Sequence, residues 1–157
     1  MSNSAATATH TRGHQQYGAV PFTVDLAGRM RVALLTSRET GRWVIPKGWP
    51  IANLTGAEVA SREAIEEAGL SGVVAASKPA GHYSYAKRLS TGQTINCQVD
   101  VYLLHVQVEL SAWPEMAQRV RAWFSPQVAA TLVAERALAK ILVGLATNLP
   151  AVTGGSA

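Results

Sequence analysis

The sequence has little of several residue types, and each shortage excludes a class of protein. Cys97 is the one cysteine among 157 residues, so neither an intrachain disulfide nor a cysteine-based metal site can form. No apolar run reaches the length of a membrane span, because the stretch "ALAKILVGLATNLPAV" is too short and contains Lys140. We therefore expect no membrane partner, and the single cysteine favours a reducing, cytoplasmic location.

Acidic residues are also scarce. The 10 Asp and Glu residues against 14 Lys and Arg residues give a net charge of +4. This balance favours an anionic partner such as a phosphate, a nucleotide or a nucleic acid, although a slightly basic protein without such a partner would have the same balance. The hydrophobic content of 48% and the charged content of 15% are typical of a globular protein, and the length fits one domain.

The order of apolar runs and turn signals predicts one domain over residues 16–148. We expect a disordered tail at residues 1–15, which have no signal-peptide core, and a flexible tail at residues 149–157. Several short β-type runs follow Tyr17, and the stretch "SPQVAATLVAERALAKILVGLA" predicts one C-terminal helix with Ser125 as its N-cap. Strands combined with two helices predict an α/β or α+β sandwich in which the helices cover a sheet.

Residues 55–68 form the clearest predicted helix. Thr55 and Glu58 have the spacing of a capping box, and Gly69 stands where a left-handed residue would end the helix. At about 100° per residue, one face collects small side chains that would let the helix pack closely on a sheet. These small residues are Ala57, Ser61, Ala64 and Ala68.

The same projection places Glu63, Glu66 and Glu67 on one face of this helix. Carboxylates so close together repel one another, and partial burial would raise their pKa values. A hard divalent cation such as Mg²⁺ would remove the repulsion, because it prefers oxygen ligands. A solvated acidic helix face would have the same spacing, so both interpretations stay open at this point.

The segment from Gly48 to Leu70 resembles the signature of the Nudix hydrolases, G-x5-E-x7-R-E-U-x-E-E-x-G-U, in which U is a bulky apolar residue. Two positions depart from the signature: Leu54 replaces the first glutamate, and Ala64 replaces an apolar residue of larger size. The flanking stretches "RWVIPKG" and "WPEMAQRVRAWFSPQVAATL" are similar to the diphosphoinositol polyphosphate phosphohydrolase-like branch. The matching residues are Gly48, Arg62, Glu63, Glu66, Glu67, Gly69 and Leu70.

The resemblance implies an α/β/α sandwich in which a mixed sheet is flanked by the signature helix and a C-terminal helix. It also implies a pyrophosphohydrolase that uses Mg²⁺ or Mn²⁺. By position, Glu63 and Glu67 would be the main metal ligands, and Glu66 a further ligand or the group that orients the attacking water. Arg62 would hold a glutamate in place through a charge-assisted hydrogen bond.

Leu54 raises the question of which residue replaces the missing glutamate. Three acids outside the signature are candidates for an extra ligand or a general base, or are ordinary surface acids: Asp100, Glu109 and Glu115. Glu58 is explained by its capping role.

Basic and aromatic residues near the signature are candidates for substrate binding. Four side chains are predicted to contact phosphate: Arg42, Lys47, Lys87 and Arg88. Lys87 and Arg88 lie close to two tyrosines in "GHYSYAKRLSTG", which could bind a polyphosphate, stack a base, or form a solvated hairpin tip. Arg119 and Arg121 in "QRVRAW" are similar to a basic stretch of the inositol-directed branch, or they face solvent.

The predicted function is hydrolysis of a diphosphate linkage in a nucleoside diphosphate linked to another group, or in a diphosphoinositol polyphosphate. Dinucleoside polyphosphates and capped RNA ends are further candidate substrates. Leu54 and Ala64 instead favour a catalytically silent Nudix domain that binds a nucleotide or RNA, and the net charge alone would suit a nucleic-acid-binding module. The sequence leaves a homodimer open.

Overall fold

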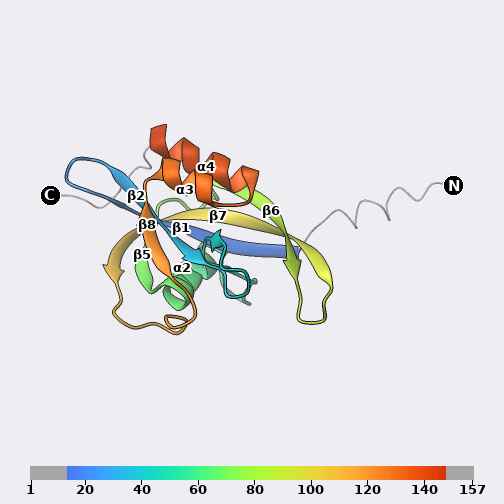
Figure 1. Cartoon of the computed structure of the whole chain (residues 1–157). Helices are drawn as coiled ribbons and strands as arrows, with labels where there is room; N and C mark the ends of the chain where they lie inside the picture. The colour runs from blue at the N-terminus through green and yellow to red at the C-terminus, as the bar shows by residue number, and fades with distance from the viewer. Residues whose placement is uncertain (1–13, 148–157) are drawn as a thin grey trace.

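The computed structural model describes residues 14–147, which form one eight-stranded mixed sheet and three helices (Figure 1). The main path of the sheet runs β3-β2-β1-β7-β5, with β4 on β1, β6 on β7 and β8 on β2. The strands are β1 (His14–Val24), β2 (Met30–Thr36), β3 (Trp43–Val44), β4 (Lys47–Gly48), β5 (Leu70–Val74), β6 (Gly81–Arg88), β7 (Thr94–Glu109) and β8 (Arg121–Phe124).

The long strands β1 and β7 pair in parallel at the centre of the sheet, from His14↔Cys97 to Phe22↔His105. On its other side, β1 pairs first with β4 and then with β2, both antiparallel. Pro21 lies between these two pairings, so its missing N–H interrupts no ladder there. Strand β7 carries β6 along its first half and β5 along its second half.

Helix α2 (Gly56–Ala68) covers one face of the sheet, and α3 (Pro126–Leu132) and α4 (Arg136–Thr147) cover the opposite face (Figure 1). Alternate residues of the central strands pack into the hydrophobic cores on the two faces of the sheet, because successive strand side chains point to opposite faces. Val20 and Phe22 pack with Leu138 and Leu142 under α4, whereas Ala19 packs with Ala60 of α2. This arrangement confirms the predicted α/β/α sandwich.

The C-terminal region differs from the single helix that the sequence predicts. Ser125 caps α3 as expected, its hydroxyl accepting from Val128 N–H, but the helix ends at Leu132 and α4 begins at Arg136. Val133 is extended (φ −82°, ψ 150°) and forms a parallel bridge with Trp43. The backbone pairing with β3 therefore competes with helix continuation, so the prediction of one continuous helix was wrong.

The tails expected at residues 1–15 and 149–157 lie outside the described residues, except for His14 and Gln15, which begin β1. Within residues 14–147, no helix combines the length and the apolar character needed to cross a lipid bilayer.

Candidate active site

Helix α2 begins and ends where the sequence predicts. Thr55 Oγ1 accepts from Glu58 N–H at 3.1 Å, and Glu58 Oε1 accepts from Thr55 N–H at 2.8 Å, which completes the capping box. Gly69 adopts the left-handed conformation (φ 66°) that ends the helix. A side chain at Gly69 would also overlap the ring of Trp113, so the turn leading into β5 requires glycine.

The small face of α2 places the helix close to the sheet. Ala60, Ala64 and Ala68 are fully buried, and Ala64 packs in the cluster that includes Tyr102 and Leu104. The departure from the signature at position 64 is therefore accommodated, because an alanine fits a position where the helix backbone lies close to the strands. This close packing brings the acidic face of α2 against the edge formed by β4.

Glu63, Glu66 and Glu67 all line one hollow of about 260 Å³ beside α2. Their environments differ, since Glu67 is buried with 8% of its surface exposed, Glu63 is half-buried and Glu66 is exposed. Glu115, from the loop between β7 and β8, also lines this hollow, which we call the carboxylate hollow. The interpretation as a purely solvated acidic face does not describe Glu67.

The carboxyl groups of Glu63 and Glu67 lie close together and are partly or largely buried, so their charged forms are unfavourable. Burial, followed by the charge of Glu67, raises the pKa of Glu63 to about 8. Burial also raises the pKa of Glu67, while Arg119 and Lys47 act in the opposite direction. The Glu67 side chain in addition accepts the N–H of Lys47 at 3.3 Å, which fixes its orientation. Without a cation, the pair therefore tends to retain a proton on Glu63.

The carboxylate hollow fits a hard divalent cation. Two adjacent carboxylates provide oxygen ligands, and Mg²⁺ commonly takes one or two of these together with water and substrate phosphate. Among residues 14–147, no three His, Cys, Asp or Glu side chains form a complete cage, so other oxygen atoms would have to complete the coordination. A Cβ at Gly48 would overlap Glu63, so the signature glycine leaves the space in which this carboxylate lies.

The guanidinium of Arg119 forms ion pairs with two carboxylates of the hollow, those of Glu67 and Glu115. Its side chain is only 9% exposed, and its Nη2 lies 3.6 Å from Glu67 Oε2. Its Nε donates to Glu115 Oε1 at 2.8 Å, and its Nη1 donates to the carbonyl oxygen of Thr36 at 3.3 Å. Arg62, to which the resemblance assigns such a hydrogen bond, is exposed and has no hydrogen-bond or ion-pair partner within residues 14–147.

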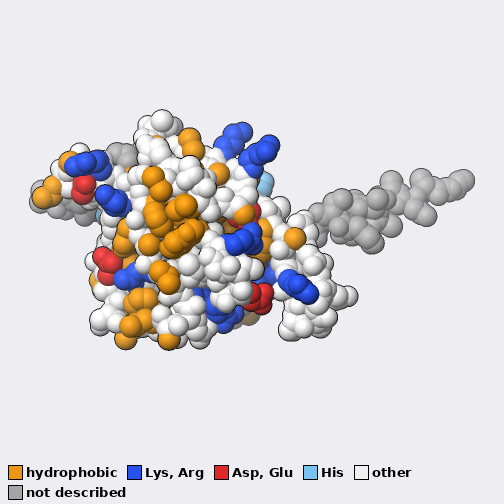
Figure 2. All heavy atoms as spheres, viewed as in Figure 1, with side chains coloured by type: hydrophobic (Ala, Val, Ile, Leu, Met, Phe, Trp, Pro, Cys, Tyr) orange, Lys and Arg blue, Asp and Glu red, His pale blue; other side chains and the backbone are white. Residues whose placement is uncertain are grey.

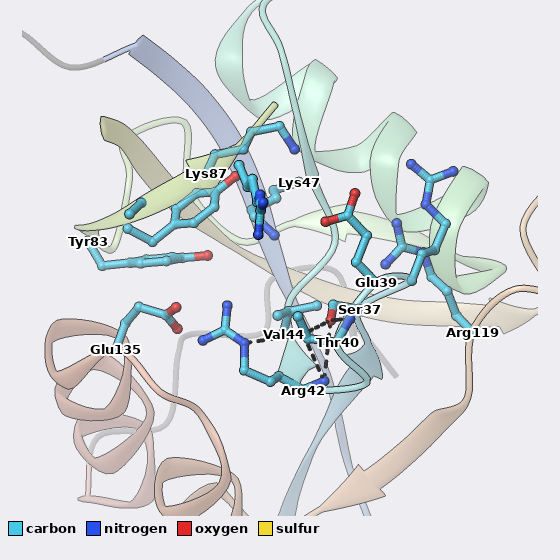
Figure 3. A pocket seen from close by; sticks show the side chains of 14 residues that line it. Ser37, Glu39, Thr40, Arg42, Val44, Lys47, Tyr83, Lys87, Arg119 and Glu135 are labelled. Carbon is cyan, nitrogen blue, oxygen red and sulfur yellow. Dashed lines mark hydrogen bonds between the residues drawn. The ribbon is translucent and has the colours of Figure 1, made fainter. Parts of the chain in front are cut away.

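The four basic residues predicted to bind substrate come together in a second, adjoining hollow of about 460 Å³. We call it the basic pocket. Figure 3 shows Lys47, Lys87 and Arg42 around this space, contributed by β4, β6 and the loop before β3. Figure 2 shows basic side chains on this face of the molecule. The lining residues that were predicted to contact substrate phosphate are Arg42, Lys47, Lys87 and Arg88.

The aromatic wall of the basic pocket is also ordered by contacts. Lys47 Nζ lies 5.0 Å from the centroid of the Tyr85 ring, and Tyr85 Oη donates to Gln16 Oε1 at 2.6 Å. Burial lowers the pKa of the Lys47 ammonium, although Glu67 partly opposes this effect. Lys47 therefore lies between the two hollows and faces both.

Sequence reasoning missed Arg38 and Glu135, which also line the basic pocket. Arg38 belongs to the charged run "SRETGR" that precedes the signature, and this run was the available signal. Glu135 lies far along the chain in the break between α3 and α4, which the sequence did not predict.

The remaining candidates lie elsewhere. Arg121 donates to the carbonyl oxygen of Ala68 at 2.7 Å and lies 4.5 Å from the Trp113 ring centroid, so it stabilises the C-terminal end of α2. Glu109 pairs with Arg121, and Asp100 accepts from Gln98 on β7. Among the three acids considered outside the signature, only Glu115 lines the carboxylate hollow. Leu54 is half-buried in the turn before α2.

Paired carboxylates beside a polybasic pocket are chemically suited to hold a divalent cation next to phosphate groups. No protein-family profile matches the chain. Nudix hydrolase 13, mitochondrial, of Arabidopsis thaliana is 30% identical over 156 residues, covering 84% of this chain and 76% of the relative. Nudix hydrolase 12, mitochondrial, of the same plant is 34% identical over 112 residues, but the chain spans only 55% of that relative.

Solved structures show the same fold. A C. elegans Ap4A hydrolase in a binary complex superposes with a TM-score of 0.61 at 18% identity, covering 85% of this chain and 96% of the other. A hydrolase of the NUDIX family from Clostridium perfringens superposes with a TM-score of 0.60 at 16% identity, covering 85% and 99%.

The chain belongs to the Nudix hydrolase family. It is a hydrolase that acts on phosphoric anhydride bonds, as the sequence predicted. Members of this family use divalent metal ions.

Proposed function

We propose that this protein hydrolyses a diphosphate linkage in a nucleoside diphosphate linked to another group, or in a diphosphoinositol polyphosphate-like substrate, with Mg²⁺ or Mn²⁺. The observation that carries the proposal is the joining of the two hollows. Lys47, Lys87 and Arg119 line both the carboxylate hollow and the basic pocket. A diphosphate bound by these cations would lie beside the glutamates of α2.

In this proposal, Glu63 and Glu67 hold the cation, and Glu66 is a further ligand or orients the attacking water. When bound, the cation would neutralise phosphate charge and lower the pKa of water. A carboxylate of the hollow then accepts the proton of the water. Glu115 is the acid outside the signature that could replace the glutamate absent at Leu54, because it lines the same hollow as Glu63 and Glu67.

The proposed substrate-binding groups are Arg42, Lys47, Lys87 and Arg88, which would neutralise the phosphates and orient the substrate. Arg62 lies four residues before Glu66 on α2, a spacing at which it can pair with that carboxylate when the site is loaded. The network that holds Glu67 in the described arrangement belongs to Arg119.

Dinucleoside polyphosphates and diphosphoinositol polyphosphates are the proposed substrate classes. The charge of the basic pocket suits the anionic phosphates of either class, because six cationic side chains line it: Arg38, Arg42, Lys47, Lys87, Arg88 and Arg119. The proposal also includes a capped RNA end as a candidate substrate, a homodimer and a cytoplasmic location.

A catalytically silent domain that binds a nucleotide or RNA is the second candidate function. The observation in its favour is Leu54, since an apolar side chain occupies the position of a signature acid. Such a domain would bind phosphate groups in the basic pocket without hydrolysing the diphosphate.

The test is release of phosphate from a panel of diphosphates, with Mg²⁺ or Mn²⁺ and with neither. We expect metal-dependent turnover by the wild type, and a loss of about 100-fold or more in Glu67→Gln. Glu58→Gln is the matched control, because it removes the same charge from the exposed capping position of the same helix. No metal-dependent turnover on any diphosphate would leave only the silent domain.

A further inference from the structure

One end of the basic pocket contains an acidic residue, Glu135, as well as basic ones. Arg42, Tyr83 and Glu135 line the basic pocket but do not line the carboxylate hollow. Because Arg119 contacts the proposed metal ligand Glu67, we call the side of the pocket away from Arg119 its distal end. In Figure 3, Glu135 and Tyr83 lie on the side away from Arg119, and the side chains of Glu135 and Arg42 point toward each other across the space.

Tyr83 presents a polar group that has no hydrogen-bond partner among residues 14–147. The residue is only 3% exposed, yet its hydroxyl makes no hydrogen bond with any residue of the described range 14–147. Figure 3 shows this hydroxyl pointing into the pocket. Burial raises the pKa of Tyr83 well above its ordinary value, and the charge of Glu135 adds to this effect. The hydroxyl therefore stays protonated and can donate to a ligand.

The distal end thus offers a hydrogen-bond donor on Tyr83 and an acceptor on Glu135. A ligand hydroxyl satisfies both, because it can accept from the phenol and donate to the carboxylate. A phosphate cannot donate when it is fully ionised, and it would be repelled by Glu135. The Arg42 Nε donates to Thr40 Oγ1 at 3.3 Å, and Arg42 forms no ion pair with Glu135 among residues 14–147, so Arg42 stays available to the diphosphate of the proposed function.

We infer that Glu135 is a specificity-determining residue, and that the distal end of the basic pocket accepts an uncharged, hydroxyl-bearing group and rejects a further phosphate. This inference rests on the proposed function, which places the diphosphate at the opposite end. It favours substrates whose diphosphate is followed by a sugar with free hydroxyls. A ring that carries phosphate on most of its carbons would place a phosphate against Glu135.

A purely structural role for Glu135 predicts a different result. Glu135 directly precedes α4, where an acidic residue can stabilise the helix N-terminus. Loss of that effect would loosen α4 and weaken all ligands of the pocket together. It would not change the ratio between two ligands that differ by one phosphate.

The test compares ADP with its 2′-phosphate derivative by isothermal titration calorimetry in EDTA. In each ligand the diphosphate is followed by a ribose that carries adenine, and the two ligands differ only in whether the 2′ oxygen of that ribose is a free hydroxyl or a phosphate. We expect the wild type to bind ADP about five- to tenfold more tightly than the 2′-phosphate, the order of effect expected for two unit charges of like sign about 4 Å apart in water. Glu135→Gln is expected to reduce this ratio to about one, and Glu135→Asp to retain most of it.

Glu39→Gln is the matched control, because Glu39 also lines the pocket but lies toward Arg119 in Figure 3. We expect it to strengthen both ligands by a similar factor. The inference is overturned if Glu135→Gln keeps the wild-type ratio, if Glu39→Gln changes that ratio as much, or if neither ligand binds. Since the measurement needs no turnover, a preserved preference in a protein without hydrolase activity would count only against the proposed function.

Discussion

The guanidinium of Arg119 lies 3.6 Å from the carboxylate of Glu67, although Arg119 belongs to the loop before β8 and Glu67 to helix α2. Because both side chains are largely buried, this ion pair holds a proposed metal ligand in one orientation. The same guanidinium contacts Glu115, so one cation orients two acids of the carboxylate hollow.

Arg119→Met is expected to lower the free energy of unfolding by about 3 kcal/mol, because it leaves Glu67 and Glu115 without their cation in a partly buried site. Arg62→Met is the matched control and is expected to change the stability by no more than about 0.5 kcal/mol, since Arg62 is exposed. Urea unfolding in EDTA measures both. Equal losses in the two variants would contradict the assignment of this role to Arg119.

The stability of the metal-free protein is expected to decrease as the pH rises. The pKa of Glu63 is raised to about 8, so the folded state binds a proton that the unfolded state has lost above its ordinary value of 4.5. The contribution to stability is therefore complete below about pH 4.5 and is lost as the pH passes about 8. Urea unfolding in EDTA at several pH values between these limits measures the slope.

Glu63→Gln is expected to flatten this dependence, because the amide does not titrate. Addition of Mg²⁺ at high pH is expected to restore stability to the wild type but not to the variant. A wild-type stability that rises from about pH 5 to about pH 8 would contradict the raised pKa of Glu63.

Gly48→Ala is expected to weaken Mn²⁺ binding by about tenfold, because the new methyl group would occupy the space of the Glu63 side chain. Titration of Mn²⁺ followed by electron paramagnetic resonance measures the free ion directly. Gly144→Ala in α4 is the control, since nothing lies within 4 Å of its added Cβ. That variant is expected to leave Mn²⁺ binding unchanged and to stabilise the protein by about 0.5–1 kcal/mol. Unchanged Mn²⁺ affinity in Gly48→Ala would show that Glu63 is not a ligand.

Arg42→Gln and Lys87→Gln are each expected to raise KM by about tenfold while kcat changes by less than about twofold. Both side chains line the basic pocket, so they contribute binding that is similar in the ground state and the transition state. Arg31→Gln, an exposed change on β2, controls for the loss of one positive charge. Steady-state kinetics at two salt concentrations would show the KM effect shrinking as salt rises. A fall in kcat at unchanged KM would contradict a role restricted to binding.

Local signals in the sequence predicted α2 in detail. The capping box at Thr55 and Glu58 and the left-handed Gly69 depend on residues within a few positions of one another, and all three are present as predicted. The carboxylate face follows from helical periodicity, which also depends only on local spacing. Arg42, Lys47 and Lys87 were found from their closeness to the signature or to aromatic residues, and the sheet brings them together.

Long-range packing determined the features that the sequence did not predict. Arg119 reaches Glu67 because the loop after β7 returns across the end of α2, and no local pattern indicates that return. The break at Val133 arises from a bridge to Trp43, a contact with a segment near the opposite end of the chain. Glu135 enters the basic pocket only because of that break.

Strand β4 consists of two residues, and each faces a different partner. Lys47 lines the basic pocket, while Gly48 lies directly against Glu63. Both are paired to β1, and the Lys47 N–H donates to Glu67 Oε1, so a ligand that shifted the β4 backbone would alter the surroundings of both proposed metal ligands. If a cation in one hollow changes the affinity of the other hollow for substrate, the effect is reciprocal: the factor that the cation adds to substrate affinity is the factor that the substrate adds to cation affinity.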